Sequence, residues 1–182
     1  DSVQQTTDGG YIITGLGVGL IKTDENGNEQ WSQTFDVTQG GNSVQQTTDG
    51  GYIITGDIPE TYSSSHTKMW LIKTDINGSQ QWAATFPSSF VNPYSLRLIS
   101  FVQETTDGGY ICSGQDLDGD TGGNVTFALK LDNAGNEEWN YISNYVCWAM
   151  MLFDAGNGDI HQTSDGGYVC SGGGIGHIYF FK

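Results

Sequence analysis

An all-β fold made of repeated antiparallel hairpins is the fold class that this sequence predicts, on three observations. The phrase Asp-Gly-Gly-Tyr occurs four times, ending at Tyr11, Tyr52, Tyr110 and Tyr168. A longer unit surrounds the phrase and is seen in its fullest form from Ser43 to Gly56. No stretch longer than a turn shows the spacing and caps of a helix. Self-similarity of this kind indicates an array of equal supersecondary units.

Each unit divides into four short strands. In the second unit we expect them over Val44–Thr47, Tyr52–Thr55, Trp70–Thr74 and Gln81–Phe86. Thr-Asp-Gly-Gly joins the first pair and Asp-x-x-Gly the last pair, and both supply an Asx-type turn with glycine at a positive φ. Four antiparallel strands joined by hairpins and repeated around a ring are the blades of a β-propeller. A β-sandwich is the main competitor, but it would not explain identical turn chemistry in every unit.

We therefore predict a single β-propeller domain, or a segment of one, made of four-stranded antiparallel blades. Its four repeats cover approximately residues 1–40, 41–92, 93–143 and 144–182. The last repeat stops after a third strand, Ile178–Phe181, so we expect it to lack an outer strand and to expose an edge. Three outcomes stay open: a fragment of a larger propeller, a four-bladed ring with a frayed last blade, or a homo-oligomer or further blades pairing with the edge after Lys182.

The blades resemble those of multi-blade β-propeller proteins secreted by bacteria and archaea, which read SVQQTTDGGYIITG followed by WLIKTDxNGxxxW. The segment Asp-x-x-Gly-x-x-x-Trp is also similar to the tryptophan-docking motif of quinoprotein-type propellers. It occurs here as Asp24, Gly27 and Trp31, as Asp75, Gly78 and Trp82, and as Asp132, Gly135 and Trp139. The resemblance covers nearly the whole chain and implies the propeller fold and secretion. It implies no organic cofactor, because the docking motif does not contain the ligands of a quinone.

Most recurring side chains are expected to serve the structure. The tryptophans of the motif should pack between blades, and the four repeat tyrosines should fill the core between them. Four lysines share one repeat position, and three aspartates follow the first three of these by two residues. A repeated Lys–Asp contact is expected because residues two apart share one face of a strand. The residues are Lys22, Lys73, Lys130 and Lys182, with Asp24, Asp75 and Asp132.

The three cysteines have no metal-ligand spacing. Cys112 and Cys170 occupy the position of Ile13 and Ile54 in the other repeats, so we expect buried free thiols that act as small apolar core residues. A disulfide with Cys147 is the alternative, which secretion would allow.

Composition favours an extracellular or cell-surface protein. Six Lys and Arg residues stand against 21 Asp and Glu residues, for a formal net charge of −15. This charge disfavours nucleic acid and anionic membrane as partners, because phosphate binding needs a positive field. No apolar run is long enough to span a membrane. The chain opens at Asp1 without a signal peptide, which is consistent with a processed protein or a fragment.

Insertions fall on one face of the predicted propeller, over residues 57–68, 87–100, 115–124 and 144–158. Because function in a rigid scaffold lies on its variable loops, we expect this insert face to bind a glycan, peptide or neighbouring subunit. Neutral drift in solvated loops is the alternative. The candidate ligand-binding residues are the aromatic side chains Tyr62, Phe90, Tyr94 and Trp148 and the polar anchors His66 and Arg97.

One insert has the chemistry of a calcium loop, with Asp116, Asp118 and Asp120 at alternate positions. A backbone carbonyl at Gly122 and the amide of Asn124 would add oxygen ligands, which Ca²⁺ prefers. The pattern resembles the calcium loops of integrin-type propellers but has Thr121 in place of Gly and Asn124 in place of Asp. A solvated acidic loop is the alternative. Asn124 and Asn77 also begin glycan acceptor sequons, and a glycan on Asn124 would compete with its role as a ligand.

We do not expect an enzyme. His66, His161 and His177 lie in different repeats and form no Ser-His-Asp or His-x-His arrangement. The favoured function is a binding or scaffold module at the cell surface or outside the cell. A structural subunit of an extracellular assembly is the alternative, and a polysaccharide-active propeller with acid and base residues in its central funnel is a lesser one.

Overall fold

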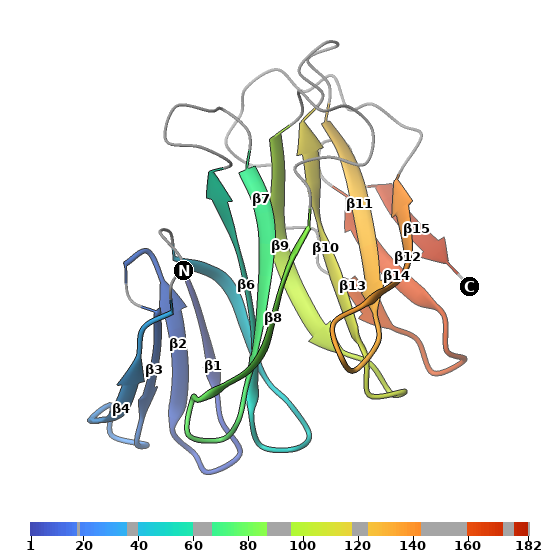
Figure 1. Ribbon diagram of the computed structural model, residues 1–182. Helices are drawn as coiled ribbons and strands as arrows, with labels where there is room; N and C mark the ends of the chain where they lie inside the picture. The colour runs from blue at the N-terminus through green and yellow to red at the C-terminus, as the bar shows by residue number, and fades with distance from the viewer. Residues whose placement is uncertain are drawn as a thin grey trace.

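The computed structural model describes residues 1–17, 19–35, 40–59, 67–86, 96–117, 124–142, 160–172 and 177–181. These residues form four antiparallel sheets and contain no helix (Figure 1). Within every sheet the strands are neighbours in chain order, three sheets having four strands and the last having three. The prediction of an all-β fold from repeated hairpins is therefore confirmed. The first and fourth sheets lie at opposite ends of the row (Figure 1).

The strands of the first two sheets are β1 (Ser2–Gln5), β2 (Tyr11–Gly15), β3 (Gly19–Thr23), β4 (Glu29–Gln33), β5 (Gly41–Gln46), β6 (Tyr52–Pro59), β7 (Thr67–Thr74) and β8 (Gln80–Phe86). Those of the last two are β9 (Leu96–Glu104), β10 (Tyr110–Leu117), β11 (Asn124–Leu131), β12 (Glu137–Ile142), β13 (Ile160–Gln162), β14 (Tyr168–Gly172) and β15 (His177–Phe181). Thr47, expected at the end of a strand, lies instead in the turn after β5.

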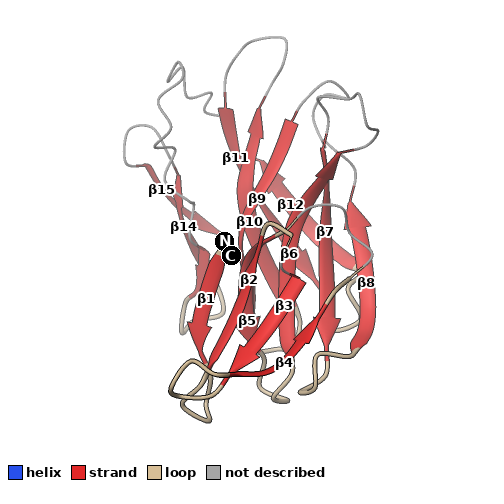
Figure 2. Ribbon diagram, turned by 90° about the vertical axis from the view of Figure 1, so that its left-hand side faces the viewer, coloured by secondary structure: helices blue, strands red, loops and turns tan. Residues whose placement is uncertain are grey.

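The same turn closes the first hairpin of every repeat. In the first repeat the Thr6 N–H donates to the Gly10 carbonyl at 2.9 Å, and the Gly9 N–H donates back to Thr6 at 2.9 Å. Gly9 has a φ of 88°, a value that costs glycine no strain. The β3–β4 turn is repeated as well, with the Gly27 N–H donating to Asp24. These turns gather at one end of the sheets, which we call the turn end (lower end of Figure 2).

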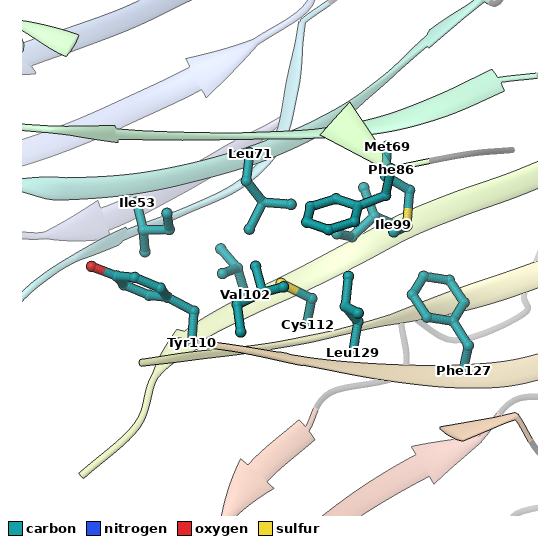
Figure 3. Packing of buried hydrophobic residues seen from close by; sticks show 11 residues of the cluster. Ile53, Met69, Leu71, Phe86, Ile99, Val102, Tyr110, Cys112, Phe127 and Leu129 are labelled. Carbon is teal, nitrogen blue, oxygen red and sulfur yellow. The ribbon is translucent and has the colours of Figure 1, made fainter. Parts of the chain in front are cut away.

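Neighbouring sheets pack face to face, and their first strands run side by side, with β1 against β5, β5 against β9, and β9 against β13. The largest core cluster lies between the second and third sheets (Figure 3). Ile53 and Leu71 of the second sheet meet Val102, Cys112 and Leu129 of the third. Because successive side chains of a strand point to opposite faces of a sheet, one sheet can supply apolar side chains to the cores on both of its sides.

No helix in the described residues is long and apolar enough to cross a membrane.

Candidate functional site

The residues predicted to bind a ligand flank or fall within segments outside the described residues. Tyr62, His66, Phe90, Tyr94 and Trp148 all lie outside them. Arg97 belongs to β9, where it pairs in register with Asp116 of β10. The structure therefore brings the backbones of two predicted site residues, one from each proposed site, side by side.

The predicted calcium ligands fall around one hairpin connection. Asp118, Asp120 and Gly122 lie outside the described residues. Asp116 and Asn124 stand at the ends of β10 and β11, where Asp116 pairs with Val125 and Leu117 with Asn124. The expected loop thus joins two paired strands. Within the described ranges, no group of three His, Cys, Asp or Glu side chains could hold a metal ion.

The repeated lysine is buried and forms the centre of a polar cluster at the turn end. Lys73 Nζ lies 2.9 Å from Asp49 Oδ2 and donates to the Thr74 carbonyl at 2.8 Å. The same contacts join Lys22 to Asp8 and Lys130 to Asp107. Lys130 adds an ion pair with Glu138 at 2.9 Å. Each lysine thus ties the first hairpin turn of its repeat to the third strand.

This geometry corrects the lysine partner expected from sequence. The carboxylates of Asp24, Asp75 and Asp132 do not pair with the lysines but accept backbone N–H groups of their own turns. Asp75 Oδ1, for example, accepts from Asn77 at 2.9 Å and from Ser79 at 2.8 Å. The partner is instead the aspartate of the Asp-Gly-Gly phrase. Lys182, the fourth lysine of the series, lies outside the described residues.

The geometry of the turn and the lysine contact together explain why the phrase needs two glycines. The first adopts a positive φ, 83° at Gly50. At the second, Gly51, a Cβ would lie 2.1 Å from the Thr74 carbonyl oxygen and 2.6 Å from Lys73 Nζ. Gly10 and Gly109 have the same neighbours in their repeats. Any side chain here would displace the lysine, so the glycine is required by close approach.

Hydrogen bonds hold the aspartates of these clusters in the charged form. The pKa of Asp8 is lowered by hydrogen bonds from Lys22, Thr6 and the Gly10 N–H. For Asp49, burial acts in the opposite direction, but bonds from Thr47 and Lys73 outweigh it and lower the pKa to about 2. The pKa of Asp107 is likewise lowered to about 2, and the largest cause is the hydrogen bond from the Thr105 side chain. The clusters are structural ion pairs whose aspartates are charged at neutral pH.

Tryptophan–tyrosine pairs join consecutive repeats, as predicted. The rings of Trp31 and Tyr52 lie 5.8 Å apart, and the pairs Trp82–Tyr110 and Trp139–Tyr168 are 5.6 Å and 5.5 Å apart. Trp31 also covers the turn of the next repeat, because its ring lies 2.6 Å from where a Cβ of Gly78 would be. The three tryptophans and the tyrosines of the second, third and fourth repeats are therefore interface residues of the fold, whereas Tyr11 of the first repeat is only partly buried.

A partly buried carboxylate that sequence reasoning did not single out joins the second and third repeats. Asp57 of β6 accepts from Asn42 Nδ2 of β5 and from the Ile99 N–H of β9 at 3.1 Å. Asn42 also donates to the Ile99 carbonyl at 2.9 Å. Burial raises the pKa of Asp57 to about 6, although both hydrogen bonds oppose this. The only sequence signal is an acidic residue directly after Gly56, where the first repeat has Leu16.

Two hollows open beside these residues. The larger, about 310 Å³, follows the first strands β1, β5 and β9 and is lined by Ser2, Gln4, Asn42, Ser43 and Ser100 among others. We call it the inner-strand groove. The smaller, about 120 Å³, is lined by Asp1, Leu16, Asn42 and Asp57 among others. The larger presents hydroxyl, amide and carboxylate groups beside apolar residues that include Val3 and Phe101. The smaller presents amide and carboxylate groups, which suit a hydrogen-bonding ligand.

The predicted burial of two cysteines in the core is confirmed. Cys112 and Cys170 are both fully buried and pair in register with Val102 and Ile160. Cys112 is a free thiol, and burial raises its pKa, so it is an inert core residue. Cys147 lies outside the described residues.

Neither models of known protein families nor curated proteins provide a match to this chain.

Proposed function

We propose that this chain is a β-propeller, or part of one, that acts outside the cell or at its surface as a binding or scaffold module. Its ligand is a glycan, a peptide or a neighbouring subunit. The ligand site lies at the end of the sheets opposite the turn end, which we call the insert end. Residues 1–40, 41–92, 93–143 and 144–182 each supply one blade.

One contrast carries the proposal. At the turn end every repeat has the same hairpin, with threonine N–H to glycine carbonyl distances of 2.8–2.9 Å. At the insert end the connection between the second and third strands differs in every repeat. It spans residues 16–18, 60–66, 118–123 and 173–176 in turn. A scaffold that keeps one end constant and varies the other is suited to presenting binding loops.

The smaller of the two hollows supports the same assignment. Both Asp57 and Leu16 lie where a second strand ends: β6 ends at Pro59, shortly after Asp57, and β2 ends directly before Leu16. The smaller hollow, which both residues line, therefore lies at the insert end. With Asp1 and Asn42 it offers acidic and amide groups beside the connections that we assign to binding.

Calcium belongs to the proposal as a structural ion. Asp116, Asp118, Asp120, Gly122 and Asn124 would hold it in the connection between β10 and β11. Three carboxylates, one carbonyl and one amide oxygen suit a hard cation, and the hairpin ends at Asp116 and Asn124 would fix the loop's entry and exit.

A loop exchange tests the binding proposal. Residues 60–66 are replaced by the three-residue connection 16–18 of the first repeat, and both proteins are screened on an array of neutral and amine-bearing glycans. We expect the exchange to weaken binding by at least about tenfold, because a binding loop is removed. Glu25→Ala, at the turn end, is the matched control and should bind like the wild type.

Unchanged binding after exchange of both 60–66 and 118–123 would move the site away from the insert end. The lack of any glycan ligand on the array would remove glycans from the proposal. Release of shortened glycans by the protein would establish an enzyme instead.

A further inference from the structure

The β7–β8 turn differs from its counterparts in the first and third repeats by one side chain. In those two repeats an asparagine ends the turn, and its side chain donates to the aspartate four residues before it, at 2.8 Å from Asn28 and 2.9 Å from Asn136. In the second repeat Ser79 stands at this position. The replacement gives up that side-chain bond and creates the sequence Asn77-Gly78-Ser79, which is an acceptor sequence for an N-linked glycan.

Both side chains that define the acceptor are exposed. Within the part of the chain that the structure describes, neither the Asn77 side-chain amide nor the Ser79 hydroxyl makes a hydrogen bond. Only their backbone N–H groups are used, and these donate to Asp75 Oδ1 at 2.9 and 2.8 Å. A glycan on Asn77 would therefore break no side-chain bond of the fold.

The residue between them anchors the turn. Gly78 is buried, and a Cβ there would lie 2.6 Å from the ring of Trp31. Asn77 and Ser79 on either side of it are exposed. The turn is thus held to the preceding repeat at one residue, while the two residues that an acceptor needs stay open to solvent.

The second acceptor sequence of the chain is placed differently. Asn124 pairs with Leu117, and Thr126 pairs with Gln115, so the β10–β11 strand pairing runs through the whole sequence. Asn124 is also one of the residues that we propose to hold Ca²⁺. Asn77, by contrast, lies in a turn whose backbone bonds are local. The structure therefore favours Asn77 over Asn124 as the acceptor.

An apolar side chain next to the acceptor would gain from a glycan. Ile76 is 58% exposed, whereas the same position holds Glu25 in the first repeat and Asn133 in the third. Its Cδ1 atom would lie 3.4 Å from a Cβ at Gly50, so the side chain rests against the neighbouring hairpin turn. A bulky, hydrated glycan on Asn77 would shield this surface from other molecules.

We propose that Asn77 carries an N-linked glycan, which stands at the turn end and leaves the insert end free for binding. The inference rests on the proposed location outside the cell or at its surface. In the transfer, Asn77 Nδ2 bonds to C1 of the first sugar of a lipid-pyrophosphate-linked oligosaccharide. The bond between C1 and the phosphate oxygen breaks, the lipid pyrophosphate leaves, and one Nδ2 proton passes to a base of the oligosaccharyltransferase.

The test is secretion of the chain from cultured eukaryotic cells, with a reference acceptor sequence in an appended tag. Intact mass and peptide mapping before and after treatment with peptide N-glycosidase locate each glycan. Most wild-type molecules should carry a glycan on Asn77, and its release should convert Asn77 to aspartate.

Two exchanges between repeats are the matched variants. Ser79→Asn removes the acceptor sequence, keeps Asn77 and gives the turn the asparagine of the other two repeats, so it should fold and lose this glycan. The reverse exchange, Asn28→Ser, creates the same acceptor sequence at Asn26 and should add a glycan there. Circular dichroism checks that both variants keep their sheets.

An unmodified Asn77 in protein whose tag is glycosylated would overturn the proposal, and so would a glycan on Asn124 with none on Asn77. The readout is the mass at Asn77 and does not depend on any ligand. Failure of the glycan proposal is therefore distinct from failure of the binding function, which the loop exchange tests.

Discussion

Replacing Asp49 by Asn removes the charge that faces a buried lysine while keeping the shape of the turn. Asn retains an oxygen that can accept from the Thr47 hydroxyl and the Gly51 N–H, the bonds that Asp49 accepts now. Lys73, only 3% exposed, keeps its bonds to the Thr74 carbonyl and to Gln81. The change therefore isolates the cost of leaving a buried ammonium without a counter-charge.

The exposure of Asp49 sets the magnitude. Breaking a fully buried pair costs roughly 3–5 kcal/mol. The Asp49 side chain is 53% exposed, so water already screens the pair and we expect a loss of about 1–2 kcal/mol in the free energy of unfolding. For a chain of this size the melting temperature should fall by about 2–8 °C.

Urea and thermal unfolding at neutral pH measure the loss. Asp75→Asn is the matched control in the same repeat, since Asp75 caps backbone N–H groups but contacts no lysine, and its loss should be less than half as large. The double variant Asp49→Asn/Lys73→Met should lose less than the sum of its single variants, because no uncompensated charge remains. Equal losses for the two aspartates, or strict additivity, would refute the assignment of the ion pair.

Three further outcomes are expected. Gly78→Ala should destabilise the protein more than Gly27→Ala. Both glycines have a positive φ near 80°, but only at Gly78 would a Cβ meet Trp31, at 2.6 Å. The extra loss in the free energy of unfolding should be about 1–3 kcal/mol, and equal melting temperatures of the two variants would contradict the tryptophan contact. The folded-state pKa of Asp57 is raised to about 6, so the free energy of unfolding of the wild type, measured relative to that of Asp57→Asn, should be greatest below pH 4. This difference should decline by on the order of 2 kcal/mol as the pH rises to 6. A difference that does not change with pH would exclude the raised pKa. Chelation of Ca²⁺ should lower the melting temperature of the wild type but not that of a variant with Asn at 116, 118 and 120, and identical wild-type melts with and without chelator would remove calcium from the proposal.

The sheets, their strand order and their turns could be predicted because their causes are local. Asp-Gly-Gly and Asp-x-x-Gly carry the carboxylate that caps the turn and the glycine that takes the positive φ. The tryptophan–tyrosine contacts could also be predicted, because large aromatic residues repeated at one position have few places to pack except between units. The ring contacts of Trp31, Trp82 and Trp139 with the tyrosines of the following repeats confirm this packing.

The lysine partner could not be predicted from strand alternation. Lys73 and Asp75 are two residues apart, but β7 ends at Thr74, so Asp75 no longer follows the strand's alternation. Its carboxylate is used by the N–H groups of its own turn. The partner Asp49 is 24 residues away and lies close only because the β5–β6 hairpin folds beside β7. Asp57 was missed for a related reason, since its burial depends on Asn42 and on Ile99 of the next repeat.

The same contacts explain why variation is confined to one end of the sheets. At the turn end, each Asp-Gly-Gly aspartate in the first three repeats is bound by a threonine hydroxyl, a backbone N–H and a lysine, so a substitution there breaks several bonds of the fold. The connections at the insert end share no repeated phrase and differ in length, and each is entered and left by strands already paired in register, such as Pro59 with Thr67 and Leu117 with Asn124. Because the pairing below fixes the sheet, exchange of the connections 60–66 and 118–123 should cost little stability beyond what a Ca²⁺ ion held by the second connection would supply. New ligand specificity should therefore be obtained by exchanging these two connections, whereas changes at the turn end should reduce stability before they alter binding.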